Sequence, residues 1–428
     1  MIGRRACLGG AQRRISSVCL VAAVLGSLSG VSEGRTLRAG RDAGSITATL
    51  AMAADGDTVI VPGGTWREHL TIEKRVTLLG EGLAVLDGDG RGTPLRIGAA
   101  GAIVRGLSVR NGGRDLGAND ACIYLEKTAK GATVQRCQVN RCAFGIYVDR
   151  TVGARIADNR VVGATTGHRS NRGNGIHLFD ASKLEIANNH ISGGRDGIYV
   201  SATEDSRFLG NRVEGGRYCV HYMFSYRNHL IGNRCNHNAH GYALMESRHI
   251  VVKDNHAVGN EGQGLLFRDA EECTISGNTL ARNGIGIFFY SSIENIVSGN
   301  LIANNEIGAK IWAGSQNNQV FNNDFIGNKQ PVFYVGSSDL VWGRDRSGNH
   351  YSDYLGWDHD GDGVGERPYR VSSFSVRLIA QYPAAALLLN SPGLELLSLL
   401  EARMPLLRVP TVVDRAPRIR RSTSRRDD

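Results

Sequence analysis

The chain has 428 residues and a formal net charge of +9, and it contains 55 Gly, only 9 Pro and 41% hydrophobic residues. This composition is typical of a folded protein rich in turns, and it excludes a chain that is disordered along most of its length. Much of the positive charge lies before residue 35 and after residue 408, so the body of the chain is a poor candidate for nucleic-acid binding.

Residues 1–34 have the pattern of a secretory signal peptide. Four arginines, Arg4, Arg5, Arg13 and Arg14, accompany an apolar run over residues 15–28 that is followed by small residues. The apolar run is short for a retained membrane span. We therefore expect this segment to direct export and to be removed, while the export route stays open.

Residues 155–325, within the candidate coil at 35–350, contain two short phrases that return with one period. One phrase carries an asparagine, and from Asn189 onward this residue recurs every 22 or 23 positions, at Asn211, Asn233, Asn255, Asn278, Asn300 and Asn323. The other phrase opens on glycine and continues with apolar residues, as at Gly175-Ile176-His177-Leu178 and Gly197-Ile198-Tyr199-Val200. Two phrases with the same period indicate a repeat architecture.

The repeats predict short strands that stack into a coil. Apolar residues alternate or are β-branched between Gly and Asn, whereas the i, i+3, i+4 spacing of a helical repeat is absent. We therefore expect an all-β protein, a right-handed parallel β-helix with rungs of about 22 residues. The hand comes from knowledge of such folds. The segment at residues 46–53 resembles a helix and can cover the first rung.

The asparagines have a local role at the bends between strands. Asparagine tolerates the left-handed backbone conformation, and its side-chain amide can bond to the same group one rung away. Cys137 takes this position in an earlier rung.

Alternation along the glycine-led strand predicts which side chains face outward. The first and third residues after the glycine should face the core, so the second and fourth should face outward. One outward column then contains Tyr147, His177, Tyr199 and His221, and the neighbouring column contains Met223 and Met245. Imidazole and thioether together suit Cu(I), so His221, Met223 and Met245 are candidate copper ligands. The alternative is an apolar and aromatic face that docks a partner protein without a metal.

Residues 163–174 lengthen one repeat from 22 to 30 residues. In a stacked coil such an excess must leave as a loop, and we expect this one to overhang the rungs of Tyr147 and His177.

Six cysteines follow the signal segment: Cys122, Cys137, Cys142, Cys219, Cys235 and Cys273. An even number in an exported chain permits disulfides, but the scattered spacing does not indicate a disulfide framework. Cys235 falls in a core-facing position and is interpreted as a buried thiol. The disulfide state of the six cysteines stays open.

After the coil, residues 351–375 form a segment rich in Asp and Gly. Asp358, Asp360 and Asp362 have the alternating carboxylates of a calcium loop. Tyr369 stands where an EF-hand needs a bidentate Glu, so the segment is not a full EF-hand. The alternative is a turn whose carboxylates bond to their own backbone.

The last two segments have other characters. Residues 376–407 are rich in Leu and Ala, are split by Ser-Pro-Gly at 391–393, and predict two short amphipathic helices for partner docking. Residues 408–428, rich in Arg and Asp, predict a basic mobile tail.

Several of these features together resemble the NosD family of periplasmic maturation proteins of nitrous-oxide reductase. They are the export signal, the rungs of 22 residues, the segment GNHYSDYLGWD at 348–358, Asp-Gly-Val-Gly at 362–365, Pro-Tyr at 368–369 and Ser-Pro at 391–392. The rungs alone are weakly specific, because many sugar-binding and sugar-cleaving β-helices share them.

The resemblance implies a periplasmic, non-catalytic scaffold or carrier that helps to assemble the copper–sulfur centre of the reductase. It implies that the protein works with an ABC transporter and with the reductase, a copper chaperone, or both. The leucine-rich sequence at 376–407 leads us to expect that these helices bind the membrane subunit of the transporter. The absence of a Walker-type Gly-Lys-Ser/Thr motif agrees with ATP being handled by another subunit. Whether the cargo is copper, sulfur or neither stays open.

The alternative function is a carbohydrate-binding or polysaccharide-cleaving β-helix. Such an enzyme needs clustered carboxylates with a basic partner on one outward face. The candidate carboxylates are scattered over turns and strand ends, and we find no pair of them in register with a basic residue: Asp149, Asp180, Asp196, Glu204 and Asp205. The sequence therefore favours docking or transfer over catalysis.

Overall fold

The computed structural model describes residues 34–371 apart from 313, 337, 344 and 345, together with residues 382, 391–393, 396, 400 and 411–422. The predicted signal peptide, except Gly34, and most of the predicted helices at 376–407 lie outside the described residues. Among the described residues, no helix is long and apolar enough to cross a membrane.

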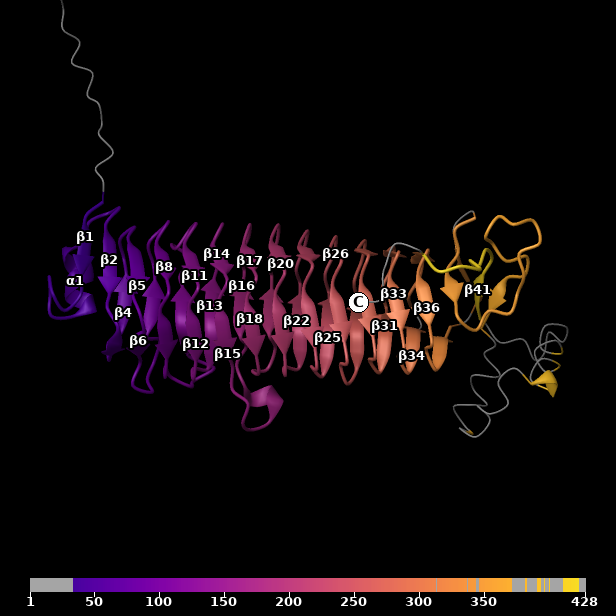
Figure 1. Cartoon of the computed structure of the whole chain (residues 1–428), viewed down its shortest axis with the longest axis horizontal. Coiled ribbons are helices and arrows are strands. Elements are labelled where there is room, and N and C mark those ends of the chain that lie inside the picture. The colour runs from indigo at the N-terminus through magenta and orange to yellow at the C-terminus, as the bar shows by residue number, and fades with distance from the viewer. Residues whose placement is uncertain are drawn as a thin grey trace, which may run out of the picture. The chain divides into compact units, whose positions relative to one another are not determined.

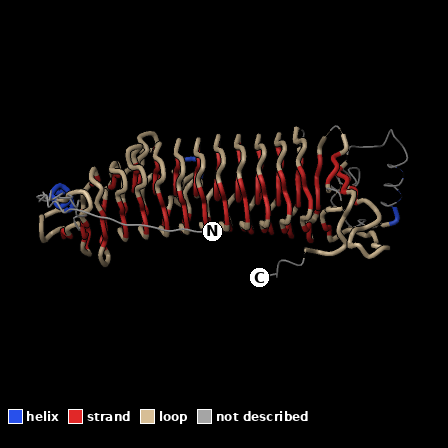
Figure 2. The backbone as a smooth tube through the Cα atoms, turned by 90° about the horizontal axis from the view of Figure 1, so that it is seen from above, coloured by secondary structure: helices blue, strands red, loops and turns tan. Residues whose placement is uncertain are grey.

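Three parallel sheets run along the coil, and each turn of the chain adds one strand to each sheet (Figure 1). Figure 2 shows the strands of successive turns side by side. A strand pairs in parallel with the strand about 22 residues later, as Arg212 pairs with Arg234. The predicted all-β parallel β-helix is therefore confirmed.

The elements have the following bounds. Sheet 1 contains β1 (Thr36–Arg38), β2 (Thr58–Val61), β5 (Thr77–Gly80), β8 (Ile103–Arg105), β11 (Thr133–Gln135), β14 (Arg155–Ala157), β17 (Glu185–Ala187), β20 (Arg207–Leu209), β23 (His229–Ile231), β26 (Val251–Lys253), β29 (Thr274–Ser276), β32 (Ile296–Ser298) and β35 (Gln319–Phe321). Sheet 2 contains β4 (Leu70–Ile72), β7 (Leu95–Ile97), β10 (Ala121–Leu125), β13 (Phe144–Asp149), β16 (Ile176–Phe179), β19 (Ile198–Ser201), β22 (Tyr218–Met223), β25 (His240–Met245), β28 (Gln263–Arg268), β31 (Ile285–Tyr290), β34 (Ile307–Ile311) and β37 (Gln330–Tyr334). Sheet 3 contains β3 (Gly64–Trp66), β6 (Ala84–Asp87), β9 (Ser108–Arg110), β12 (Gln138–Asn140), β15 (Arg160–Val162), β18 (His190–Ser192), β21 (Arg212–Glu214), β24 (Arg234–Asn236), β27 (His256–Val258), β30 (Thr279–Ala281), β33 (Leu301–Ala303), β36 (Asp324–Ile326) and β39 (His350–Tyr351). A small sheet holds β38 (Leu340–Trp342), β40 (Tyr369–Arg370) and β41 (Val412–Asp414). The described residues before β40 contain the helix α1 (Ile46–Met52) and the 3-10 helix η1 (Arg169–Asn171).

The inside of the coil is apolar because alternate residues of each strand face inward. On sheet 2, Ile176, Leu178, Ile198 and Val200 are fully buried, as the alternation predicts. Burying one such side chain contributes roughly 1.5–3 kcal/mol to folding. At the first turn, Ser45 caps α1 and Ile46 is buried, so the predicted helix covers this end of the core.

A buried ladder of asparagines joins successive turns. The Oδ1 atom of Asn233 accepts hydrogen bonds from both the backbone N–H and the Nδ2 of Asn211, each at 2.9 Å, while its own Nδ2 donates to Asn255 Oδ1. Cys137 stands at the start of the ladder and donates its backbone N–H to Asn159 Oδ1, as predicted. A second ladder, which the sequence pattern did not reveal, contains Asn238, Asn260, Asn283, Asn305 and Asn328.

The C-terminal segment differs from the predicted mobile tail over its described part, residues 411–422. Strand β41 pairs with β38 and β40, and Val412 and Asp414 are fully buried. The Oδ2 atom of Asp414 accepts two hydrogen bonds of 2.8 Å from Asn349 and so ends the asparagine ladder. The segment is ordered because the last turn would otherwise leave these polar groups and its apolar end uncovered.

Two disulfides join cysteines for which the scattered spacing did not indicate a disulfide framework: Cys122 with Cys142, and Cys219 with Cys235. Cys235 occupies the predicted core-facing position between Val213 and Ala257, but it is not a free thiol. Strands β22 and β24 bring the Cα atoms of Cys219 and Cys235 to 5.6 Å, within the range that a disulfide spans.

Candidate functional site

Sheet 2 carries the predicted outward column. Strand register pairs Tyr147 with His177, His177 with Tyr199, and Tyr199 with His221. The ring centroids are 4.4, 4.9 and 5.1 Å apart in that order. The structure therefore brings these four residues into one continuous stack.

The stack faces outward but is largely covered. Tyr147 and His221 are only 5% and 7% exposed. Phe144 packs edge-on against Tyr147 and His177, and Tyr218 lies 4.7 Å from His221 between ring centroids. Phe144 and Tyr218, the first residues of β13 and β22, thus shield the stack, which alternation alone does not predict.

The structure also places the predicted copper ligands together. The Nε2 atom of His221 lies 3.4 Å from the Sδ atom of Met245, and both residues are buried. Met223 pairs with Met245 in the strand register and packs against the small apolar cluster around Met245. His221 and Met245 are in direct contact, and Met223 lies on the same strand as His221, one rung before Met245.

Asp196 completes this cluster, although sequence reasoning counted it among the scattered carboxylates. Its Oδ2 atom lies 3.1 Å from His221 Nδ1 and accepts a hydrogen bond of 2.7 Å from Arg217 Nη2. The side chain is fully buried. Burial alone raises the pKa of Asp196, but the hydrogen bonds from His221 and Arg217 outweigh it and lower the pKa to about 2.

The repeat period is the sequence feature that could have revealed this cluster. Arg217 follows Asp196 by 21 residues and His221 follows it by 25, so both belong to the next rung. The expectation that no pair of these carboxylates is in register with a basic residue is therefore wrong: Arg217 bonds to Asp196, and Arg227 pairs with both Glu204 and Asp205 of the rung before it. Because Asp196 is buried and keeps its charge at neutral pH, it is poorly suited to act as a general acid.

His177 lies in a different environment within the same stack. Asn174 Nδ2 donates a hydrogen bond of 3.0 Å to His177 Nδ1. Burial first, and then the positive charge of Arg195, lower the pKa of His177 to about 4. His177 is therefore neutral at physiological pH.

The loop at residues 163–174 leaves the coil as predicted and runs further along it than expected. Arg169 in η1 forms an ion pair of 3.2 Å with Glu261, which precedes β28 and lies 92 residues away in the chain. The loop therefore lies near the start of β25, where His240 stacks on Tyr218.

The Asp-rich segment gathers its carboxylates. Asp358, Asp360 and Asp362 each place one oxygen within 4.8 Å of the others. Asp358 also accepts hydrogen bonds from the backbone N–H groups of Gly361 and Gly363, at 2.7 and 2.9 Å. These contacts are those of a turn bonded to its own backbone, and calcium at this loop stays a prediction.

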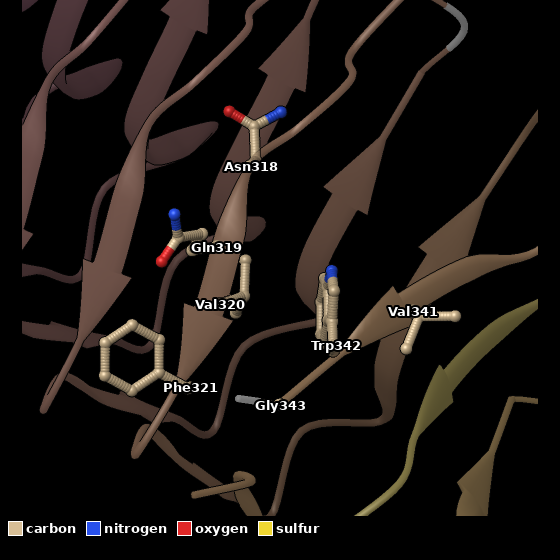
Figure 3. Close-up of a pocket in the computed structure, with 7 residues that line it drawn as sticks. All are labelled: Asn318, Gln319, Val320, Phe321, Val341, Trp342 and Gly343. Carbon is tan, nitrogen blue, oxygen red and sulfur yellow. The ribbon is translucent and has the colours of Figure 1, made fainter. Parts of the chain in front are cut away.

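A cleft of about 310 Å³ lies between β35 and β38 (Figure 3). Its lining contains none of the predicted site residues: Asn318, Gln319, Val320, Phe321, Val341, Trp342 and Gly343. Trp342 is buried at the end of the coil and stacks on Phe325. The cleft is therefore separate from the cluster around His221.

Comparison with known proteins places the chain in a family. A family model described as "Periplasmic copper-binding protein (NosD)" matches residues 160–356. The "Probable ABC transporter binding protein NosD" of Pseudomonas aeruginosa is 38% identical over 386 residues, covering 87% of this chain and 90% of that protein. The protein of the same name from Stutzerimonas stutzeri is 36% identical over 397 residues, covering 89% and 91%.

The chain belongs to the NosD family. The resemblance drawn from the sequence is thereby confirmed, and the matched range of the NosD model includes Asp196, His221 and Met245. Among solved structures, the receptor-binding tailspike of bacteriophage Det7 has a TM-score of 0.51 at 10% identity, covering 78% of this chain and 79% of that one. This last likeness shows the fold alone.

Proposed function

We propose that this NosD-family chain binds Cu(I) in the periplasm through His221 and Met245, with Met223 as a neighbouring third ligand. The observation that carries the proposal is the 3.4 Å contact between His221 Nε2 and Met245 Sδ. Thioether sulfur is a soft ligand that selects Cu(I), and imidazole nitrogen also binds copper. The family's description as a copper-binding protein supports the choice of metal.

The ligand set suits a cargo that is passed on. Two or three protein ligands leave a coordination position open, and a ligand from a partner can enter there. The outward columns of sheet 2 continue beyond the site with exposed aromatic residues, among them Phe179, Tyr290 and Trp312. A partner that takes or delivers the ion can contact this face, which also contains Tyr147 and Tyr199.

The role proposed for the carrier is assembly of the copper–sulfur centre of nitrous-oxide reductase. The resemblance in the sequence and the relatives' name, ABC transporter binding protein, support this role together with an ABC transporter as partner. The reductase, a copper chaperone, or both would then exchange copper with the face around His221. The protein acts in this scheme as a scaffold without catalysis.

Competition with a Cu(I) chelator tests the binding site. Removing a ligand should weaken binding more than the roughly 10-fold minimum seen when an outer-shell partner is lost, so His221→Ala and Met245→Ala should each lower Cu(I) affinity by more than about 10-fold. His229→Ala on β23 and Met52→Ala on α1 are controls, because both lie on other elements. Unchanged affinity in both site variants would remove the proposal.

Attachment to the transporter is proposed to occur through residues 376–407. Their leucine-rich sequence supports this, and the test is to excise 376–407 while keeping 408–428, because β41 covers the end of the coil. The shortened protein should fold and bind Cu(I) but no longer co-purify with the membrane subunit. Recovery of the intact complex would show that another surface makes the attachment.

A further inference from the structure

We infer that Asp196 is a positioning residue for His221: it holds the imidazole in the tautomer with its proton on Nδ1, so that the lone pair of Nε2 faces Met245 Sδ. This inference rests on the proposed Cu(I) site and adds a residue to it. Asp196 need not touch the metal, because its oxygen meets the other nitrogen of the ring.

The hydrogen-bond donors and acceptors around His221 determine its tautomer. Asp196 is ionised and therefore only accepts hydrogen bonds, so the histidine nitrogen at 3.1 Å must be the donor. Arg217 Nη2 also lies 3.4 Å from His221 Nδ1, but it donates to Asp196 Oδ2 at the shorter distance of 2.7 Å. A neutral imidazole with its proton on Nδ1 has a bare Nε2. A thioether has no proton either, so two lone pairs face each other, and a cation can bind between them.

Asp196 is itself held in place by its neighbours. Its backbone N–H donates to Asn174 Oδ1 at 3.2 Å, and its Oδ1 accepts from Arg217 Nε at 2.9 Å. A fully buried carboxylate with these contacts has one orientation, which it imposes on the ring of His221.

The chain also contains the opposite case. Asn174, one rung before Asp196 in the same column, donates its amide to His177 Nδ1, which leaves the proton of that neutral ring on Nε2. An asparagine at position 196 can do the same to His221. The variant Asp196→Asn would then place a proton on Nε2, between the two ligand atoms.

The test combines spectroscopy with metal binding. In copper-free protein labelled with ¹⁵N-histidine, Nδ1 of His221 should be protonated in the wild type and Nε2 in Asp196→Asn, and Cu(I) affinity should fall about 10- to 100-fold in the variant. Asp205→Asn is the matched control, because Asp205 also pairs with an arginine one rung later, Arg227, in an exposed position away from His221. This control should leave both readouts unchanged.

A double-mutant cycle separates positioning from general stability. In a His221→Met background the ligand has no tautomer, so Asp196→Asn should cause no further loss of Cu(I) affinity. If Asp196 only stabilised the local structure, Asp196→Asn would lower the affinity in this background as well. A wild-type spectrum with the proton on Nε2 of His221 overturns the inference. This measurement uses the wild-type protein alone, so it does not depend on whether a variant folds. If His221→Ala binds as tightly as the wild type, the Cu(I) site itself fails; if it binds weakly while Asp196→Asn binds normally, only the positioning role fails.

Discussion

His177 and His221 share one outward column, yet different groups face them. Asn174 and the charge of Arg195 act on His177, whereas the carboxylate of Asp196 meets His221. The first environment keeps a histidine neutral inside an aromatic stack, and the second orients a histidine toward a sulfur atom. Two residues of the same type in one column therefore have different roles.

The pKa of His177 leads to a prediction about stability and pH. The folded pKa is about 4 and the ordinary value is 6.5, so the unfolded chain binds more protons between these values. The free energy of unfolding should therefore fall as the pH falls from 6.5 to 4, by up to roughly 3 kcal/mol from this residue. His177→Phe keeps a ring in the stack and should remove this part of the pH dependence. Denaturant titrations at several pH values measure the free energy of unfolding of both proteins. If this free energy changes with pH in the same way in the wild type and in His177→Phe, His177 does not titrate in this way.

At this scale the sequence predicted which residues stand in a column but not what covers or orients them. Alternation assigned Tyr147, His177, Tyr199 and His221 to one outward column, because the strand period is the same in every turn of the coil. Asp196 lies just before its strand, where alternation makes no statement, so its contact with the next rung was missed. The shielding by Phe144 and Tyr218 was missed for another reason: they are the first residues of β13 and β22, three positions before Tyr147 and His221, where strict alternation places a side chain inside.

The elements of the coil are held in register by buried amides as well as by apolar packing. In the central rungs each ladder asparagine accepts two hydrogen bonds from the turn before and donates to the turn after. One polar side chain per turn therefore resists a slip of one strand against the next.

The ladder leads to a second prediction. Asn233→Ala leaves the backbone N–H and the Nδ2 of Asn211 without their acceptor inside the protein, which should lower the free energy of unfolding by roughly 2–4 kcal/mol. Asn236→Ala in the same turn is the control, because that side chain is only half-buried on β24 and should change stability by less than about 0.5 kcal/mol. Urea unfolding measures both variants. Equal stability of Asn233→Ala and the wild type would contradict a structural role for the ladder.

Two elements of the fold were not predicted from the sequence patterns. The first ladder was visible because glycine or a second polar residue marks it in every turn, whereas the ladder from Asn238 to Asn328 begins late and lacks such a phrase. Strand β41 was missed because its three residues stand in a segment dominated by Arg and Asp. Its partners β38 and β40 lie far from it in the chain, and local composition does not encode such a pairing.

At the scale of the whole molecule, the coil holds one sheet face in a fixed register over many turns. Its repeated turns place Asp196, His221 and Met245, which are separated by up to 49 residues in the chain, within one contact network. The same face continues on both sides of this network with aromatic side chains. Such a scaffold can hold an ion at one point and present a partner-binding surface around it.

X-ray absorption at the copper edge of the Cu(I)-loaded protein tests the central claim most directly, because it identifies the atoms bound to the ion. The account predicts one imidazole nitrogen and at least one sulfur, with the sulfur signal reduced in Met245→Ala and the imidazole signal lost in His221→Ala. A spectrum with only nitrogen and oxygen ligands, or one that neither substitution changes, would contradict it.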